Sequence, residues 1–205
     1  MEMYQRLVAY KDQYGSTCVP VRYEIDPQLG EWVKSQRKGY NNTSNLKLSV
    51  DRRNLLNSIG FVWDPLDAKW TEMYERLVAY KEQYGSTCVP ARYEIDRQLG
   101  DWVKNQRKLN NTNQPSLTAE RKHQLNSIDF VWDPLDAKWT EMYERLVAYK
   151  DQYGSTCVPK SYRADRKLAT WVHTQRKSYN TNSAHLTAAK KRQLSSIGFV
   201  WKVKK

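Results

Sequence analysis

The chain carries the same stretch of sequence three times with few changes. It reads EMYERLVAYKEQYGSTCVP at residues 72–90, and its counterparts lie at residues 2–20 and 141–159. Equivalent tryptophans are 70 residues apart from Trp32 to Trp102, and 69 residues apart from Trp102 to Trp171. A fixed period of this kind is typical of tandem repeats, so the fold of one copy decides the fold of all three.

The middle copy shows the strongest helix signals. Asp64 followed by Pro65 is typical of an N-cap and a first helical residue, and Gly85 is placed to end the helix. Between them, apolar residues recur every three or four positions, as on one face of an amphipathic helix. These residues are Leu66, Trp70, Met73, Leu77, Tyr80 and Tyr84. The pattern therefore predicts a first helix of about 20 residues.

A second and a third helix are predicted in each copy. Residues 86–94 contain Pro90 and suit an extended loop pinned by Val89 and Tyr93. In the first copy, Asp26 and Pro27 then mark the start of a second helix. One face of that helix presents Leu29, Trp32, Val33 and Gln36. The third helices are expected to follow the N-cap residues Ser49, Thr118 and Thr187.

The predicted fold class is all-α, with three tandem three-helix bundles joined by very short connections. The sequence FVWDPLDAKW occurs at residues 61–70 and again at 130–139, so a helix start follows Trp63 with almost no linker. We predict repeats at residues 1–63, 64–132 and 133–205, the last with a basic tail. The first copy has no counterpart of Trp70 and Trp139, and we interpret the start of the sequence as cut from a longer chain.

The spaced motifs resemble those of a known family. The pattern is an aromatic first helix, then Gly, VP, LGxW, QR and IGFxW. In the middle copy it is carried by Gly85, Val89, Pro90, Leu99, Gly100, Trp102, Gln106, Arg107, Ile128, Phe130 and Trp132. It resembles the helicase-associated domain, a short repeat found in several copies in bacterial and algal helicase-like proteins. The resemblance implies a three-helix bundle and a role in nucleic-acid binding, with Ala169 and Asp129 as departures from the glycines of the pattern.

The charge balance favours an acidic partner. The chain has 34 Lys and Arg against 22 Asp and Glu, a net charge of +12, and basic proteins of this kind commonly bind nucleic acid. The excess is uneven: residues 1–69 carry 10 basic and 8 acidic side chains, residues 70–138 carry 10 of each, and residues 139–205 carry 14 and 4. We expect the third repeat to supply most of the electrostatic affinity, with DNA and RNA both open as ligands.

The second helix of each copy presents three basic side chains, and the loop before that helix supplies one more. Lys and Arg neutralise phosphates, so this arrangement suits a groove that follows a nucleic-acid backbone. The third helix of the last copy adds another cluster. The candidate nucleic-acid-binding residues are Arg22, Lys34, Arg37, Lys38, Arg92, Lys104, Arg107, Lys108, Arg163, His173, Arg176, Lys177, Lys190, Lys191 and Arg192. A merely solvated basic face is the competing interpretation.

Other residue types favour structure over chemistry. The glutamines Gln36, Gln106 and Gln175 fall on the core-facing side of the second helix, where an amide that ties a loop or helix end to the bundle is favoured over base reading. The tyrosines are expected to pack in the core rather than to stack on bases. The cysteines Cys18, Cys88 and Cys157 occupy one equivalent position and are expected to be buried.

No constellation for catalysis, a metal or a cofactor is recognised. The three histidines hold non-equivalent positions, and no GxxxxGK[ST] phosphate loop occurs in the sequence, so neither a helicase motor nor an enzyme is predicted. We expect no cofactor, no small-molecule substrate and no membrane association. Without a signal peptide, an intracellular location (cytoplasm, nucleus or an organelle) is expected. The alternative function is a multivalent protein-interaction scaffold with one docking surface per repeat.

Overall fold

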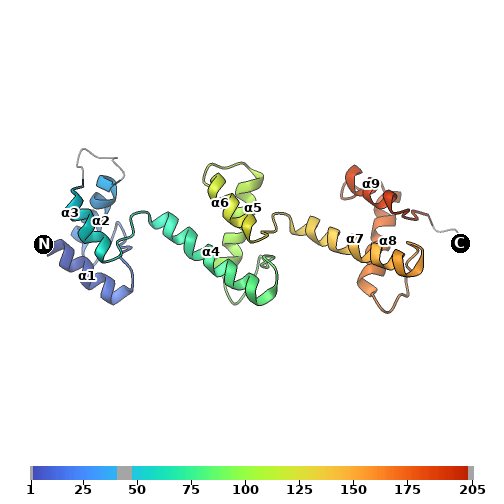
Figure 1. The fold of residues 1–205 in the computed structure, drawn as a ribbon, viewed down its shortest axis with the longest axis horizontal. Helices are drawn as coiled ribbons and strands as arrows, with labels where there is room; N and C mark the ends of the chain where they lie inside the picture. The colour runs from blue at the N-terminus through green and yellow to red at the C-terminus, as the bar shows by residue number, and fades with distance from the viewer. Residues whose placement is uncertain (1, 41–47, 203–205) are drawn as a thin grey trace. The chain divides into compact units, whose positions relative to one another are not determined.

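The computed structural model describes residues 2–40 and 48–202, and within them the chain is all-helical, as predicted (Figure 1). The helices are α1 (Glu2–Tyr14), α2 (Pro27–Tyr40), α3 (Val50–Ser58), α4 (Pro65–Tyr84), α5 (Arg97–Asn111), α6 (Ala119–Ser127), α7 (Pro134–Tyr153), α8 (Arg166–Asn180) and α9 (Ala188–Ser196). The chain divides into two compact units, residues 1–104 and 105–205. The first unit contains the whole first repeat, and the second contains the whole third repeat.

The helix starts and ends follow the local signals in the sequence. The Asp64 carboxylate accepts hydrogen bonds from the backbone N–H groups of Leu66 (2.9 Å) and Asp67 (3.0 Å), and so caps α4. Gly85 ends the helix in the left-handed conformation, at φ 72°. The predicted N-caps of the third helices are also confirmed, because the side chains of Ser49, Thr118 and Thr187 each accept a bond from the first turn.

In the first and third repeats, three helices and the loop after the first helix share one core. The core of the third repeat consists of Trp139, Met142, Leu146, Val158, Leu168, Ala169, Val172, Leu186, Leu194 and Phe199. The core of the first repeat consists of Leu7, Val19, Leu29, Val33, Leu56 and Phe61. Two clusters built from equivalent positions explain why the same sequence pattern gives the same fold twice.

Buried threonines join distant parts of each of these repeats. The Thr156 hydroxyl donates to the Gly198 carbonyl (3.1 Å) and accepts from the Val200 N–H (3.1 Å). Thr17 accepts from the Val62 N–H at 2.9 Å in the same way. The hydroxyl therefore fixes the loop after the first helix against the end of the third helix. The sequence predicted only an extended loop at these residues.

Two expectations about burial were wrong. The predicted apolar stripe of the first helix does not extend to its ends: Leu66 is 80% exposed, and its equivalent Leu135 is 81% exposed. These leucines lie in the first turn, one turn before the core begins at Trp139 in α7. The cysteines are not buried either, since Cys157 is exposed and Cys18 is half-buried. Each follows an inward-facing threonine, and neighbouring residues of an extended segment point to opposite sides.

Candidate nucleic-acid interface

A groove of about 720 Å³ on the third repeat gathers basic side chains from three segments. Lys160 comes from the loop before α8, His173, Arg176 and Lys177 come from α8, and Lys202 follows α9. Among the lining residues that the structure describes there is no carboxylate. Like charges converging in a concave surface raise its positive potential, so the groove suits a polyanion.

An aromatic side chain completes the wall of this groove. Trp201 lines it and stacks on Tyr179 with ring centroids 4.4 Å apart. Phe199 meets the same indole edge-on at 4.6 Å. A tryptophan fixed beside several cations is the combination used to stack unpaired bases while the backbone is neutralised.

Arg176, which lines the groove, has a structural role that the sequence did not predict. Arg176 Nε donates to the Val200 carbonyl (2.9 Å), Nη2 donates to the Thr156 carbonyl (3.3 Å), and the guanidinium lies over the Phe199 ring at 5.5 Å. Burial lowers the pKa of Arg176 from its usual value, although the group stays cationic at neutral pH. It therefore holds two backbone segments together while adding positive charge to the groove.

The equivalent arginines are placed in the same way. Arg37 donates to the carbonyls of Val62 (3.0 Å) and Thr17 (3.2 Å), and burial also lowers its pKa. Arg107 donates to the Val131 carbonyl at 2.9 Å. The expectation that these three guanidinium groups are free to meet phosphates is corrected accordingly, because each one donates at least one hydrogen bond to a backbone carbonyl.

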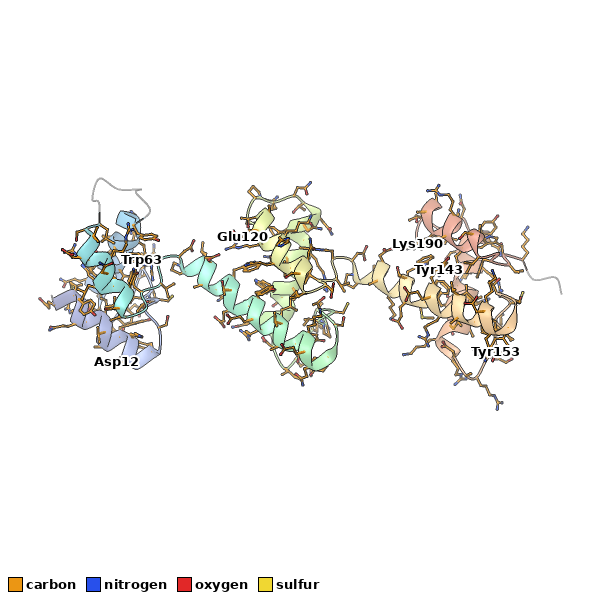
Figure 2. All side chains as sticks on the ribbon, in the orientation of Figure 1. Asp12, Trp63, Glu120, Tyr143, Tyr153 and Lys190 are labelled. Carbon is orange, nitrogen blue, oxygen red and sulfur yellow. The ribbon has the colours of Figure 1, made fainter. Side chains whose placement is uncertain are left out.

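Two of the three predicted cations on the third helix of the last repeat, Lys190 and Lys191, also have partners within the protein. Lys190 Nζ lies 2.9 Å from the Asp136 carboxylate and 5.2 Å from the centre of the Trp139 ring, and its side chain is only 19% exposed. Figure 2 labels Lys190 on α9. Lys191 donates to Asn182 at 3.3 Å, whereas Arg192 is exposed. Lys190 thus stabilises the repeat, contrary to the expected role as a phosphate contact.

The corresponding surface of the first repeat is less basic. Lys34 pairs with Glu31 at 3.0 Å, and Arg22 lines a hollow of about 310 Å³ together with Glu24 and Glu31. Lys38 is exposed. The carboxylates offset the cations here, and the described hollow that contains Arg22 is lined by two glutamates.

The remaining predicted residues are exposed but are not gathered into a described groove. Arg92 and Lys104 are exposed in the first unit, and Lys108 and Arg163 are exposed in the second. The sequence analysis missed Lys160 and Trp201 as parts of the interface. Comparing the repeats position by position could have found Lys160, because Val21 and Ala91 stand at the equivalent positions.

The buried glutamine has a partner other than the one predicted. Gln175 Oε1 accepts a hydrogen bond from the Trp139 indole N–H at 3.2 Å. The prediction of a structural role is confirmed, but the amide fixes a side chain of the first helix rather than a loop or helix end. This places Gln175 in the core, away from any role in reading bases.

Searches for other kinds of site give two findings for the described residues. Within residues 2–40 and 48–202, no cluster of His, Cys, Asp and Glu is arranged to hold a metal ion. Across the same ranges, every helix is too short or too polar to cross a lipid bilayer.

Helical units follow one another along residues 2–40 and 48–202, and a basic groove lies on the third repeat. The model of the helicase associated domain family matches residues 1–64, 67–133 and 136–202. The chain therefore belongs to that family, as three tandem copies of its domain. No curated protein and no solved structure matches the chain.

Proposed function

We propose that this chain binds nucleic acid without catalysing a reaction, chiefly through the groove of the third repeat. Lys160, Lys177 and Lys202 contact phosphates, and Trp201 offers its ring to an unpaired base. The observation that carries this proposal is the convergence of these cations around a fixed indole with no carboxylate among the described lining residues. Arg176 contributes its charge from the groove wall, while its hydrogen bonds keep the wall in place.

Paired charge-removing variants of the full chain test this proposal. Lys160→Gln with Lys202→Gln removes two groove cations, whereas Lys138→Gln with Lys167→Gln removes two exposed cations from elsewhere on the same repeat. Fluorescence anisotropy with labelled single-stranded and double-stranded DNA and RNA measures Kd at several salt concentrations. Each phosphate contact contributes about 0.7 to 0.9 to the slope of log K against log salt.

The groove variant is expected to weaken binding on every sequence and to lower that slope by about 1.5, if both lysines meet phosphates. The control pair should change the slope by less than about 0.5, since distant surface charges act only through the screened field. Equal losses in the two variants would mean that net charge alone is responsible. Binding that is absent or independent of salt would contradict the proposal.

The alternative of a multivalent protein-interaction scaffold retains one supporting observation. Leu66 and Leu135 are equivalent residues, and both are strongly exposed. Exposed apolar side chains repeated at one position suit repeated contacts with the same partner. Loss of a protein partner on changing both leucines to Ser, with nucleic-acid affinity unchanged, would favour this function.

A further inference from the structure

A second groove on the third repeat, of about 670 Å³, is lined by side chains of α7 and α8, and we call it the α7–α8 groove. Its apolar lining consists of Leu135, Trp139, Met142 and Trp171. The rings of Trp139 and Trp171 meet edge-on with centroids 5.7 Å apart, and Leu135, one turn before Trp139, is 81% exposed. Exposed apolar side chains gathered at a groove are typical of a surface that binds another protein.

Basic side chains complete the lining of the α7–α8 groove. Lys138, Arg166 and Lys167 line it and are exposed, and Thr170 adds an uncharged hydroxyl. No carboxylate is among the lining residues that the structure describes. Within residues 2–40 and 48–202, none of the three cations takes part in an ion pair. The groove therefore combines apolar surface with positive charge that the described residues leave unpaired.

The carboxylates nearest to these cations along the chain have other partners. Asp136 pairs with Lys190 at 2.9 Å, and Asp165 pairs with Arg145 at 2.6 Å. Glu141 also pairs with Arg145, at 3.4 Å. Because these acids are engaged within the fold, the positive charge of the groove is available to a ligand from outside. Complementary charge then favours an acidic ligand.

The middle repeat keeps the apolar part of this surface. Trp70 is 8% exposed and meets Trp102 edge-on with ring centroids 5.8 Å apart, as Trp139 meets Trp171 in the third repeat. Leu66, the counterpart of Leu135, is 80% exposed. The apolar residues alone therefore do not distinguish the third repeat from the middle one.

The charges at this surface do distinguish the two repeats. Gln98 and Asp101 stand in the middle repeat where the third repeat has Lys167 and Thr170. The exchange adds one cation and removes one carboxylate in the third repeat. An acidic ligand should consequently prefer the third repeat, although the apolar contacts are alike.

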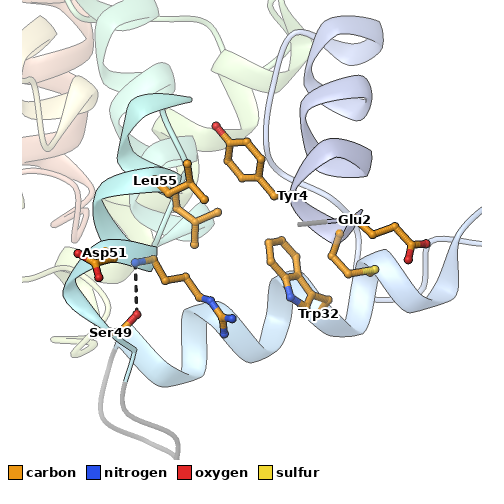
Figure 3. A pocket seen from close by; sticks show the side chains of 9 residues that line it. Glu2, Tyr4, Trp32, Ser49, Asp51 and Leu55 are labelled. Carbon is orange, nitrogen blue, oxygen red and sulfur yellow. Dashed lines mark hydrogen bonds between the residues drawn. The ribbon is translucent and has the colours of Figure 1, made fainter.

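The first repeat also carries carboxylates around the counterpart of Trp171. That counterpart is Trp32, and Glu31 beside it holds the position of Thr170. Asp51 lies in the same region as Trp32 (Figure 3), and Ala189 holds its position in the third repeat. At the position of Thr170, then, both other repeats have a carboxylate that would repel an acidic ligand.

We propose that the α7–α8 groove docks an acidic segment of a partner protein, a role beyond nucleic-acid binding. A leucine or phenylalanine of the segment packs on Trp171 and Leu135. Asp or Glu side chains on either side of it pair with the groove cations, Lys138, Arg166 and Lys167. An apolar anchor flanked by charge pairs fits this lining better than a nucleic-acid backbone does, because phosphates gain nothing from an apolar surface.

Designed peptides test the chemistry of the ligand on the full chain. Isothermal titration calorimetry with the capped peptide EDDLFDDE is expected to show saturable binding at one site per chain. The peptide EDDSSDDE lacks the apolar anchor and QNNLFNNQ lacks the charges, so each should bind at least about tenfold more weakly. Equal affinity for EDDLFDDE and EDDSSDDE would mean that charge alone attracts the peptide, and would overturn the proposal. So would the absence of saturable binding.

A matched pair of variants locates the site on α8. Thr170→Glu places in the groove the carboxylate type that Glu31 supplies in the first repeat, so the helix should tolerate it. It should weaken binding of EDDLFDDE at least about tenfold. Thr174→Glu adds the same charge at an exposed position of α8 outside the lining, and should weaken it less than about twofold. Circular dichroism checks the helices, and equal losses in the two variants would contradict the assigned site.

Reciprocal variants separate this site from the basic groove. Lys138→Gln with Lys167→Gln should weaken the peptide, whereas Lys160→Gln with Lys202→Gln should leave its Kd unchanged. Nucleic-acid affinity should fall equally in Thr170→Glu and Thr174→Glu, because their net charges are the same. A larger loss of nucleic-acid affinity in Thr170→Glu would assign the α7–α8 groove to nucleic acid and overturn the proposal.

A gain of binding in the middle repeat is the strictest test. Gln98→Lys with Asp101→Thr gives this repeat the two residues that distinguish the groove of the third. Calorimetry should then show a second site for EDDLFDDE, because the apolar residues are already in place. If the variant still binds the peptide at one site per chain, the charges at these positions do not decide binding and the proposal is wrong.

Discussion

The first and third repeats share one fold and differ where a ligand could bind. In the third repeat basic side chains from the loop before α8, from α8 and from the segment after α9 line one groove, with no carboxylate among its described lining residues. In the first repeat Glu31 offsets Lys34 on the surface of α2, and Glu24 and Glu31 line the hollow that contains Arg22. The residues that are the same in both repeats form the helices and their core, whereas the residues that differ determine the charge of each surface. Function in this array is therefore to be sought in the differences between repeats.

The largest expected effect comes from removing the buried indole of the third repeat. Trp139→Ala removes a buried indole and leaves Gln175 without its donor, so it should lower the local unfolding free energy by about 3–5 kcal/mol. Hydrogen-exchange mass spectrometry on peptides from α8 measures this in the full chain. Leu135→Ala, in the same helix but exposed, should cost less than about 0.5 kcal/mol. Similar values for the two variants would contradict the assignment of Trp139 to the core.

A smaller effect is expected from the arginine that ties the backbone segments together. Arg176→Ala removes two hydrogen bonds to carbonyls and the contact with Phe199, and should destabilise the third repeat by about 1–2 kcal/mol. Arg37→Ala should cost a similar amount in the first repeat, because its bonds are equivalent. Thermal unfolding by circular dichroism, with the exposed Lys177→Ala as control, distinguishes this from a loss of charge alone. An unchanged melting curve for Arg176→Ala would show that its bonds do not stabilise the fold.

A third test gives the first repeat the charges found at the groove of the third repeat. Val21→Lys with Glu31→Thr gives this repeat the residue types found at Lys160 and Thr170, and also frees Lys34 from its carboxylate. Nucleic-acid affinity at low salt should rise about 3- to 10-fold, as expected for one or two added phosphate contacts. A control with the same change in charge, Gln5→Lys with Asp12→Thr on exposed positions of α1, should raise it less than twofold. Equal gains would assign the effect to net charge.

The fold was predictable because its signals are local. Capping residues such as Asp64 act within one turn, and because the three copies are so similar, an assignment made in one copy applies to the other two. The contacts of Arg176 and Thr156 were not predictable in this way, since both reach backbone groups 20 or more residues away. A helical face alone does not distinguish a phosphate contact from a carbonyl contact. The bond from the Trp139 indole N–H to Gln175 was also beyond the sequence, because it joins two helices 36 residues apart.

The smallest change in stability is expected at a position where the two repeats carry the same residue, the glycine after the third helix. Gly60 and Gly198 end the third helices at φ 64° and 68°, and a Cβ added at either would meet nothing within 4 Å. Alanine at either position should therefore lower the free energy of unfolding only by the cost of the left-handed backbone conformation, about 1 kcal/mol in each repeat. Asp129, at φ 52°, already accepts this conformation in the middle repeat, so Asp129→Gly should change stability by less than about 0.5 kcal/mol. Hydrogen exchange at α3 and α9 should give equal losses for Gly60→Ala and Gly198→Ala, because the strain is local to the turn. If the two stability losses differ by more than about 1 kcal/mol, the two repeats differ in the backbone of this turn as well as in their surfaces.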